Sequence, residues 1–241
     1  MKSLLPLALL LLAALPAAAA PGDDSLLALS WQPAFCEANR HRAECRDEDP
    51  GGFAAGNLAL HGLWPQGRGS RAPAYCGVPD EVREKDRTGR WHELPPVPLS
   101  PELRREVDRV MPGARSHLDR HEWIKHGTCS GLSADDYFRE SVELVEAAAG
   151  TRFGRLLTAR VGGTVTVAEL CEAMRADFGE GFEDSVHIHN SGRNLSEIRI
   201  LLDEKPGGDF TLGRGGLADG RSRLRCDGSD GRRELRVDPA G

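Results

Sequence analysis

The sequence is short of lysine and of aromatic residues, and it has no excess of positive charge. Lysine occurs at only four positions, aromatic residues make up 5% of the chain, and the formal net charge is −6 at pH 7. Proteins that bind nucleic acid non-specifically usually display a basic surface, so the composition argues against tight general binding. Positive charge gathered at one place would still suit an anionic substrate.

Long hydrophobic runs are absent after the first twenty residues. Those residues contain Lys2, an apolar run from Leu4 to Leu15 and a run of alanines at 17–20. The run is too short to span a membrane comfortably, and an A-x-A cleavage site follows it. We expect residues 1–19 to be a cleaved signal peptide, with the mature protein secreted or periplasmic and without a membrane partner.

The remaining chain has no internal repeat and no linker, which favours one domain over 20–226 and a polar tail over 227–241 that frays. Residues 67–98 are rich in glycine, proline and charge and predict an irregular surface excursion. We expect an α+β fold, monomeric by default, with a central antiparallel sheet and flanking helices. The expected strands are 25–31, 57–63, 185–189, 197–202 and 222–226, and the expected helices start at Ser100, Ser116, Ser133 and Thr166, the last with a capping box to Glu169.

The cysteines lack the C-x-x-C spacing that is typical of zinc sites. In an exported protein, six cysteines predict disulfide bonds, although the sequence permits many pairings. Free or metal-bound cysteines are the alternative. We favour three bonds. Cys36–Cys45 would close a small loop, and Cys76–Cys129 would join the segments that follow two histidine-containing blocks. Cys171–Cys226 is the pair that remains.

The most informative block is 121–129, with the sequence H-E-W-I-K-H-G-T-C. On a helix, residues four apart share a face, so His121 would lie over Lys125 and Glu122 over His126. Proton carriers and positive charge gathered in this way suit a reaction at an anionic centre. A second block, L-H-G-L-W-P at 60–65, supplies another histidine and a tryptophan. We predict that the two blocks form one active site.

Simpler explanations compete with this prediction. A zincin site needs histidines four apart, whereas His121 and His126 are five apart and would point about 140° away from each other. A solvated helix face is common, but Trp123 and the following G-T-C indicate a buried helix end. Trp64 is equally compatible with a place in the core and with a stacking platform for a base.

The other histidines carry weaker signals. His187 and His189 share a face of an expected strand, which permits metal binding, although exposed strand histidines are far commoner. His41, His92 and His117 have no partner pattern and are expected at the surface.

The two blocks together resemble the two active-site segments of the ribonuclease T2 family. The segment W-Q-P-A-F-C at 31–36 and the pair Tyr137-Phe138 also match, so the resemblance covers most of residues 25–180. It implies an endoribonuclease that cleaves single-stranded RNA through a 2′,3′-cyclic phosphate without a metal or other cofactor. Every residue that the family uses for this chemistry is present.

The resemblance also implies roles for individual residues. His126 would be the general base and His61 the general acid, because histidine titrates near the working pH. Glu122 and Lys125 would stabilise the phosphorane, and His121 would hold the phosphate. From its place on the helix, Glu122 would also orient His126 or raise its pKa.

Trp64, Gln66 and Leu118 occupy the positions that would contact the bases. Two of them depart from the family pattern, since relatives often have an aspartate in place of Gln66 and an aromatic in place of Leu118. The resemblance therefore implies low base specificity.

Two other functions fit parts of the sequence. The first is an exported RNA-binding homologue without catalysis. The second is a metal-dependent hydrolase that uses His187, His189 and the region of His121.

Overall fold

Alternating apolar residues build one twisted sheet. The computed structural model describes residues 21–67, 72–218, 220 and 222–241, so the expected signal peptide lies outside the described residues. The sheet has the order β2-β1-β5-β6-β3, and β4 also pairs with β5. Its pairs are antiparallel apart from a single parallel pair between β5 and β6. The strands are β1 (Pro21–Ser30), β2 (Ala59–Gly67), β3 (Thr164–Thr166), β4 (Val186–Ser191), β5 (Asn194–Leu202) and β6 (Glu234–Arg236).

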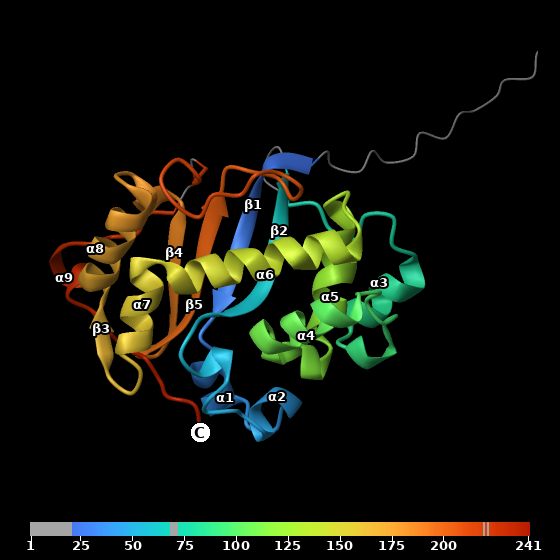
Figure 1. Ribbon diagram of the computed structural model, residues 1–241, viewed down its shortest axis with the longest axis horizontal. Helices are drawn as coiled ribbons and strands as arrows, with labels where there is room; N and C mark the ends of the chain where they lie inside the picture. Colours follow the sequence, from blue (N-terminus) through green and yellow to red (C-terminus); the bar gives the residue numbers. More distant parts are fainter. Residues whose placement is uncertain (1–20, 68–71, 219, 221) are drawn as a thin grey trace, which may run out of the picture.

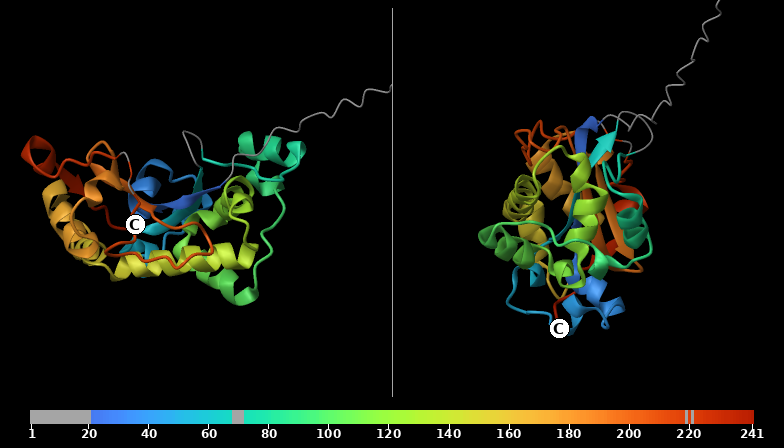
Figure 2. Two further views of the ribbon diagram at one scale, coloured as in Figure 1. Left: turned by 90° about the horizontal axis from the view of Figure 1, so that it is seen from above. Right: turned by 90° about the vertical axis from the view of Figure 1, so that its right-hand side faces the viewer.

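Helices cover one face of this sheet and extend beyond one edge. Helices α6, α7 and α8 lie along one face, and α3, α4 and α5 lie beyond the β2 edge (Figures 1 and 2). Leu27, Leu29, Ile198 and Ile200 point into the core and are fully buried. The helices are α1 (Gln32–Ala38), α2 (Ala43–Arg46), α3 (Asp80–Arg87), α4 (Pro101–Val110), α5 (Leu118–Lys125), α6 (Ala134–Gly150), α7 (Arg152–Ala159), α8 (Val167–Phe178) and α9 (Gly228–Gly231). No helix among the described residues is long and apolar enough to cross a membrane.

The α+β class and all three disulfides are confirmed. Cys36–Cys45, Cys76–Cys129 and Cys171–Cys226 are bonded. Two of the expected helix caps are also confirmed. Ser133 accepts a hydrogen bond from the backbone of Asp136, and Thr166 and Glu169 form the capping box.

α4 begins at Pro101 directly after Ser100, as expected, whereas α5 begins after His117 and not after Ser116. The Ser100 side chain makes no capping hydrogen bond, and its backbone N–H donates to Asp135 Oδ1 at 2.8 Å. Ser116 does not cap α5, because its hydroxyl is bonded to Glu44. A serine side chain that bonds a tertiary partner is no longer available to cap its own helix.

The segment expected to be an irregular excursion, 67–98, contains α3. This short helix is supported by a favourable charge order, with Asp80 and Glu81 in its first turn and Lys85 and Arg87 in its last. Lys85 also pairs with Glu81 at 2.9 Å. The composition of residues 67–98 gave no sign of this helix.

The C-terminal residues do not form a frayed polar tail. They add β6, in which Leu235 is fully buried, and Val237 beyond it is fully buried too. Trp31 Nε1 donates a hydrogen bond to the backbone oxygen of Asp238 at 2.8 Å. The domain therefore continues well past residue 226, and the expected strand 222–226 is not formed, because this segment has no regular secondary structure.

Candidate active site

A β-bulge in β2 brings His61 and Trp64 to the same face of the sheet. Side chains three apart on a regular strand point to opposite faces. Here the register with β1 shifts by one residue at His61, and such a bulge re-aims a side chain. Leu60 and Leu63 can then both be buried in the core. On the other face, the His61 and Trp64 rings meet edge to face, with centroids 5.3 Å apart.

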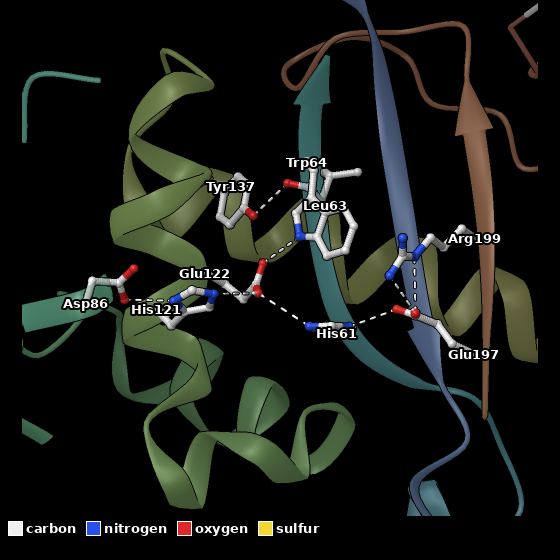
Figure 3. Close-up of polar contacts among 9 residues, drawn as sticks. All are labelled: His61, Leu63, Trp64, Asp86, His121, Glu122, Tyr137, Glu197 and Arg199. Atoms are coloured by element: carbon white, nitrogen blue, oxygen red, sulfur yellow. Dashed lines mark hydrogen bonds and ion pairs between the residues drawn. The ribbon is translucent and has the colours of Figure 1, made fainter. Parts of the chain in front are cut away.

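Glu122 lies on α5 at the centre of the site, with a side chain that is 1% exposed. Its Oε2 accepts a hydrogen bond from Trp64 Nε1 at 2.7 Å. Its Oε1 has no hydrogen-bond partner among the described residues and lies 3.7 Å from His61 Nε2 and 3.8 Å from His121 Nε2 (Figure 3). Burial raises the pKa of Glu122, although the neighbouring imidazoles and the tryptophan act in the opposite direction.

His61 is held from β5. Its Nδ1 lies 2.8 Å from Glu197 Oε1, and Arg199 donates to the other Glu197 oxygen from Nη2 at 2.9 Å and Nε at 3.1 Å (Figure 3). These hydrogen bonds lower the pKa of Glu197 although burial would raise it. Burial would likewise lower the pKa of His61, but the hydrogen bond to Glu197 and the charges of Glu122 and Glu197 raise it overall.

A matching arrangement holds His121 from α3. Its Nδ1 lies 2.7 Å from Asp86 Oδ1, and the Asp86 side chain is fully buried. Tyr75 donates its hydroxyl to the second Asp86 oxygen at 2.8 Å, and Trp91 stacks on the imidazole with centroids 4.5 Å apart. In both histidines a carboxylate binds Nδ1, which directs Nε2 toward Glu122.

His126 ends α5 and has a different environment. Its ring stacks on Trp64 with centroids 5.2 Å apart, and its buried Nδ1 has no hydrogen-bond partner among the described residues. Burial, followed by the positive charges of Lys125, His121 and His61, lowers its pKa to about 3. The two expected catalytic histidines are therefore shifted in opposite directions.

One expectation about Glu122 is wrong. It was expected to orient His126 or raise its pKa, but the pKa is lowered, and Glu122 is not among the groups that shift it. The reason is that the carboxyl group turns toward Trp64 and the other two histidines.

Lys125 lies at the last turn of α5, where the backbone is fixed on both sides. Tyr75 donates its backbone N–H to the Lys125 carbonyl at 2.9 Å, and the Cys76–Cys129 disulfide closes the same region. The Lys125 charge lowers the pKa values of both His126 and Glu122. The Lys125 charge therefore acts on two neighbouring groups of the site.

The three expected base-binding residues lie in different surroundings. The Trp64 ring is engaged within the protein, since His126 stacks on it and the Arg199 guanidinium lies 5.0 Å from its centroid. Gln66 donates to the Trp64 carbonyl at 2.9 Å, which uses part of its hydrogen-bonding capacity. Leu118 lines a pocket beside His61, together with Ser30, Gln32, Phe35, Arg42, Glu44, Leu60, Trp91, Gly113 and Ser116.

His187 and His189 lie side by side on β4, with ring centroids 4.2 Å apart. Within the described residues, no group of three or more histidine, cysteine, aspartate or glutamate side chains is arranged to hold a metal ion. The two histidines and His121 therefore do not form the ligand set that a metal-dependent hydrolase would need.

The carboxylates that hold the histidines were not predicted from the sequence. Glu197 and Arg199 alternate with buried isoleucines on β5, and two opposite charges two residues apart on an otherwise apolar strand were the available signal. Asp86 had none, because its helix was not predicted.

The chain matches the family model described as Ribonuclease T2 family over residues 22–208. Ribonuclease I of Escherichia coli strain K12 is 33% identical over 203 residues, which are 75% of this chain and 75% of that protein. A probable ribonuclease of Haemophilus influenzae is 32% identical over 139 residues, which are 54% of this chain and 44% of that protein.

Solved structures agree on the fold. The T2 ribonuclease Actibind has a TM-score of 0.54 at 16% identity, covering 92% of this chain and 89% of its own. An RNase-related protein from Calystegia sepium has a TM-score of 0.55 at 15% identity, covering 91% and 98%. The fold is thus that of the T2 ribonucleases. More narrowly, this chain belongs to the ribonuclease T2 family, whose members act on RNA.

The geometry around Gly62 generates a direct prediction. A Cβ at this position would lie 2.8 Å from Glu122 Cδ and closer still to Trp64 Nε1. The substitution Gly62→Ala should push the carboxyl group off its position and lower RNA cleavage by about 10²-fold, the order of loss expected for a misplacement near 1 Å.

The matched control is Gly150→Ala at the end of α6, where an added Cβ meets nothing within 4 Å. Cleavage rates of both variants on one RNA, with circular dichroism to check folding, make the comparison. Full activity of a folded Gly62→Ala variant would contradict this account of the site.

Proposed function

We propose that this protein cleaves single-stranded RNA by metal-independent transphosphorylation. In the first step the 2′-oxygen loses its proton to a base and attacks phosphorus. The bond to the 5′-oxygen breaks, and an acid gives that oxygen a proton. Water then opens the 2′,3′-cyclic phosphate with the roles of acid and base exchanged.

The observation that carries this proposal is the opposite shift of two histidine pKa values around one buried carboxyl group. A lowered pKa keeps His126 neutral and able to accept a proton, whereas a raised pKa keeps His61 protonated. Titratable groups driven apart in this way are the mark of an acid–base pair. His126 is therefore proposed as the base and His61 as the acid.

Glu122, His121 and Lys125 are proposed to stabilise the phosphorane. The pKa of Glu122 is raised and its Oε1 is buried between the Nε2 atoms of His61 and His121, so this group is proposed to act on the phosphorane through these two imidazoles. His121, with Nδ1 bound to Asp86, presents Nε2 to the same space. Lys125 adds a compact positive charge against the developing negative charge.

The compartment and assembly state are part of the proposal. Three disulfides are typical of proteins from oxidising compartments, and the leader expected at 1–19 agrees with a secreted or periplasmic protein. We propose a monomer that needs no cofactor and takes single-stranded RNA as its substrate.

The first experiment is cleavage of single-stranded RNA in excess EDTA, with the product ends checked for 2′,3′-cyclic phosphate. His61→Ala and His126→Ala should each lower the rate by about 10²–10⁴-fold, the usual contribution of a general acid or base. His41→Ala is the control, because His41 is exposed and outside the site.

Other outcomes point to other functions. Activity that EDTA abolishes and zinc restores would favour a metal-dependent hydrolase. A folded, oxidised protein that binds RNA without cleaving it would favour the non-catalytic alternative.

The dependence of kcat/KM on pH tests the assignment of acid and base. The acid limb should lie near pH 3, where His126 takes up a proton, and the alkaline limb above about 6.5, where His61 loses one. Glu197→Gln removes the charge that raises the His61 pKa, so the alkaline limb should move to lower pH while the acid limb stays. Glu102→Gln, an exposed site on α4, should move neither limb; an unmoved alkaline limb in Glu197→Gln would refute the assignment.

Low base specificity is the remaining proposal. Leu118, in the pocket beside His61, offers no hydrogen bond to a base edge, and Gln66 has an amide that both donates and accepts. Trp64, Gln66 and Leu118 stay the proposed base-binding residues. Rates on the full set of dinucleoside phosphates should lie within about tenfold, the scale of 1.4 kcal/mol; a strong preference for adenine would contradict this.

A further inference from the structure

Positive charge gathers in a groove at the β4 edge of the sheet, away from the catalytic histidines. The groove is lined by three arginines and two histidines, with one carboxylate, that of Asp230, among them. The chain as a whole is acidic, with a net charge of −6, so the excess of basic side chains in this groove is a local feature. The basic side chains are His187, His189, Arg223, Arg225 and Arg233.

The arginines of this groove are available to a ligand. Arg223 and Arg225 are exposed and make no ion pair or hydrogen bond within the part of the chain that the structure describes. Arg233 donates one hydrogen bond to Asn190 Oδ1 at 3.2 Å and has no carboxylate partner there. By contrast, Arg109, Arg160 and Arg175 elsewhere on the surface are paired with glutamates.

The backbone that carries the two free arginines is well anchored. Ser222 and Leu224 donate backbone hydrogen bonds to the carbonyls of Asp184 and Glu183, at 2.8 and 3.2 Å. Leu224 packs against the core between the two exposed arginines. Cys226, which follows Arg225, is bonded to α8 by its disulfide with Cys171. The guanidinium groups therefore project from a fixed edge.

The groove and the catalytic site share one face of the sheet. Glu197 and Arg199, which hold His61, lie directly opposite His189 and His187 on the neighbouring strand, so their side chains point the same way. On β1 the residues facing that side are the small Ala28 and Ser30, and His61 reaches over them to Glu197 (Figure 3). A polar surface thus runs from His61 to the groove.

We propose that this groove binds backbone phosphates of the RNA substrate beyond the one that is cleaved. This inference rests on the proposed function. β2 and β4 are separated by β1 and β5, so the groove lies about 14 Å from His61 at the usual spacing of strands. A dinucleoside phosphate carries only the scissile phosphate and cannot reach it, whereas a longer strand can.

The binding test uses a long single-stranded 2′-deoxy oligonucleotide, which lacks the attacking hydroxyl and cannot be cleaved by this chemistry. The double variant R223Q/R225Q should weaken binding about 2- to 30-fold, the range for two exposed ion pairs. The slope of log affinity against log salt should fall by about 1.4, since each phosphate contact to a single strand contributes about 0.7. R152Q/R155Q, which changes two exposed arginines of α7, is the control of equal charge and should bind as the original protein does.

The cleavage test separates the groove from the catalytic site. R223Q/R225Q should lower kcat/KM on a polyribonucleotide by the same factor and leave the rate on a dinucleoside phosphate unchanged. Equal losses on both substrates, or no loss on either, would overturn the groove proposal. So would a loss of binding to vesicles of anionic phospholipid with oligonucleotide binding intact, because the groove would then serve a membrane surface. Failure of the original protein to cleave any RNA would instead refute the proposed function, while oligonucleotide binding still decides the groove.

Discussion

A carboxyl group buried between a strand and a helix dictates how the two halves of the site meet. Glu122 is inaccessible to water, and an unpartnered buried carboxyl group is costly, so Trp64 Nε1 has to reach one of its oxygens. Trp64 reaches it because a bulge at His61 turns both rings to the same face. The approach is close enough that residue 62 can have no side chain. Bulge, glycine and tryptophan are therefore parts of one solution to burying Glu122.

The two histidines beside Glu122 are positioned by carboxylates as well. Each binds a carboxylate through Nδ1, His61 with Glu197 from β5 and His121 with Asp86 from α3. Their Nε2 atoms then converge on Glu122, and their positive charges, with that of Lys125, lower the pKa of His126. The opposite pKa shifts of His61 and His126 thus follow from the carboxylates beside His61 and from the burial of His126. An acidic protein can in this way keep a local cationic centre for a phosphate.

Sequence alone predicted the parts of the site that are local in the chain. His121, Glu122, Lys125 and His126 lie within one helical segment, so their spacing was enough, and the capping box at Thr166 was equally local. Glu197 meets His61 across 136 residues of sequence, and no spacing rule predicts such a pairing. The bulge could not be predicted, because the alternation of side chains along a strand assumes a regular register. The buried C-terminal strand was missed because its polar neighbours hid two apolar residues that fill the core.

The open face of the sheet links these observations. A strand that is buried on one face must alternate, and on β4 and β5 the outward positions carry His187, His189, Glu197 and Arg199. Pairing between strands places these side chains in rows, so the support of His61 and the basic groove are built by the same register. Slipping that register by one residue would bury the charges and expose the isoleucines. The core that stabilises the sheet therefore also fixes the direction in which a bound strand of RNA would run.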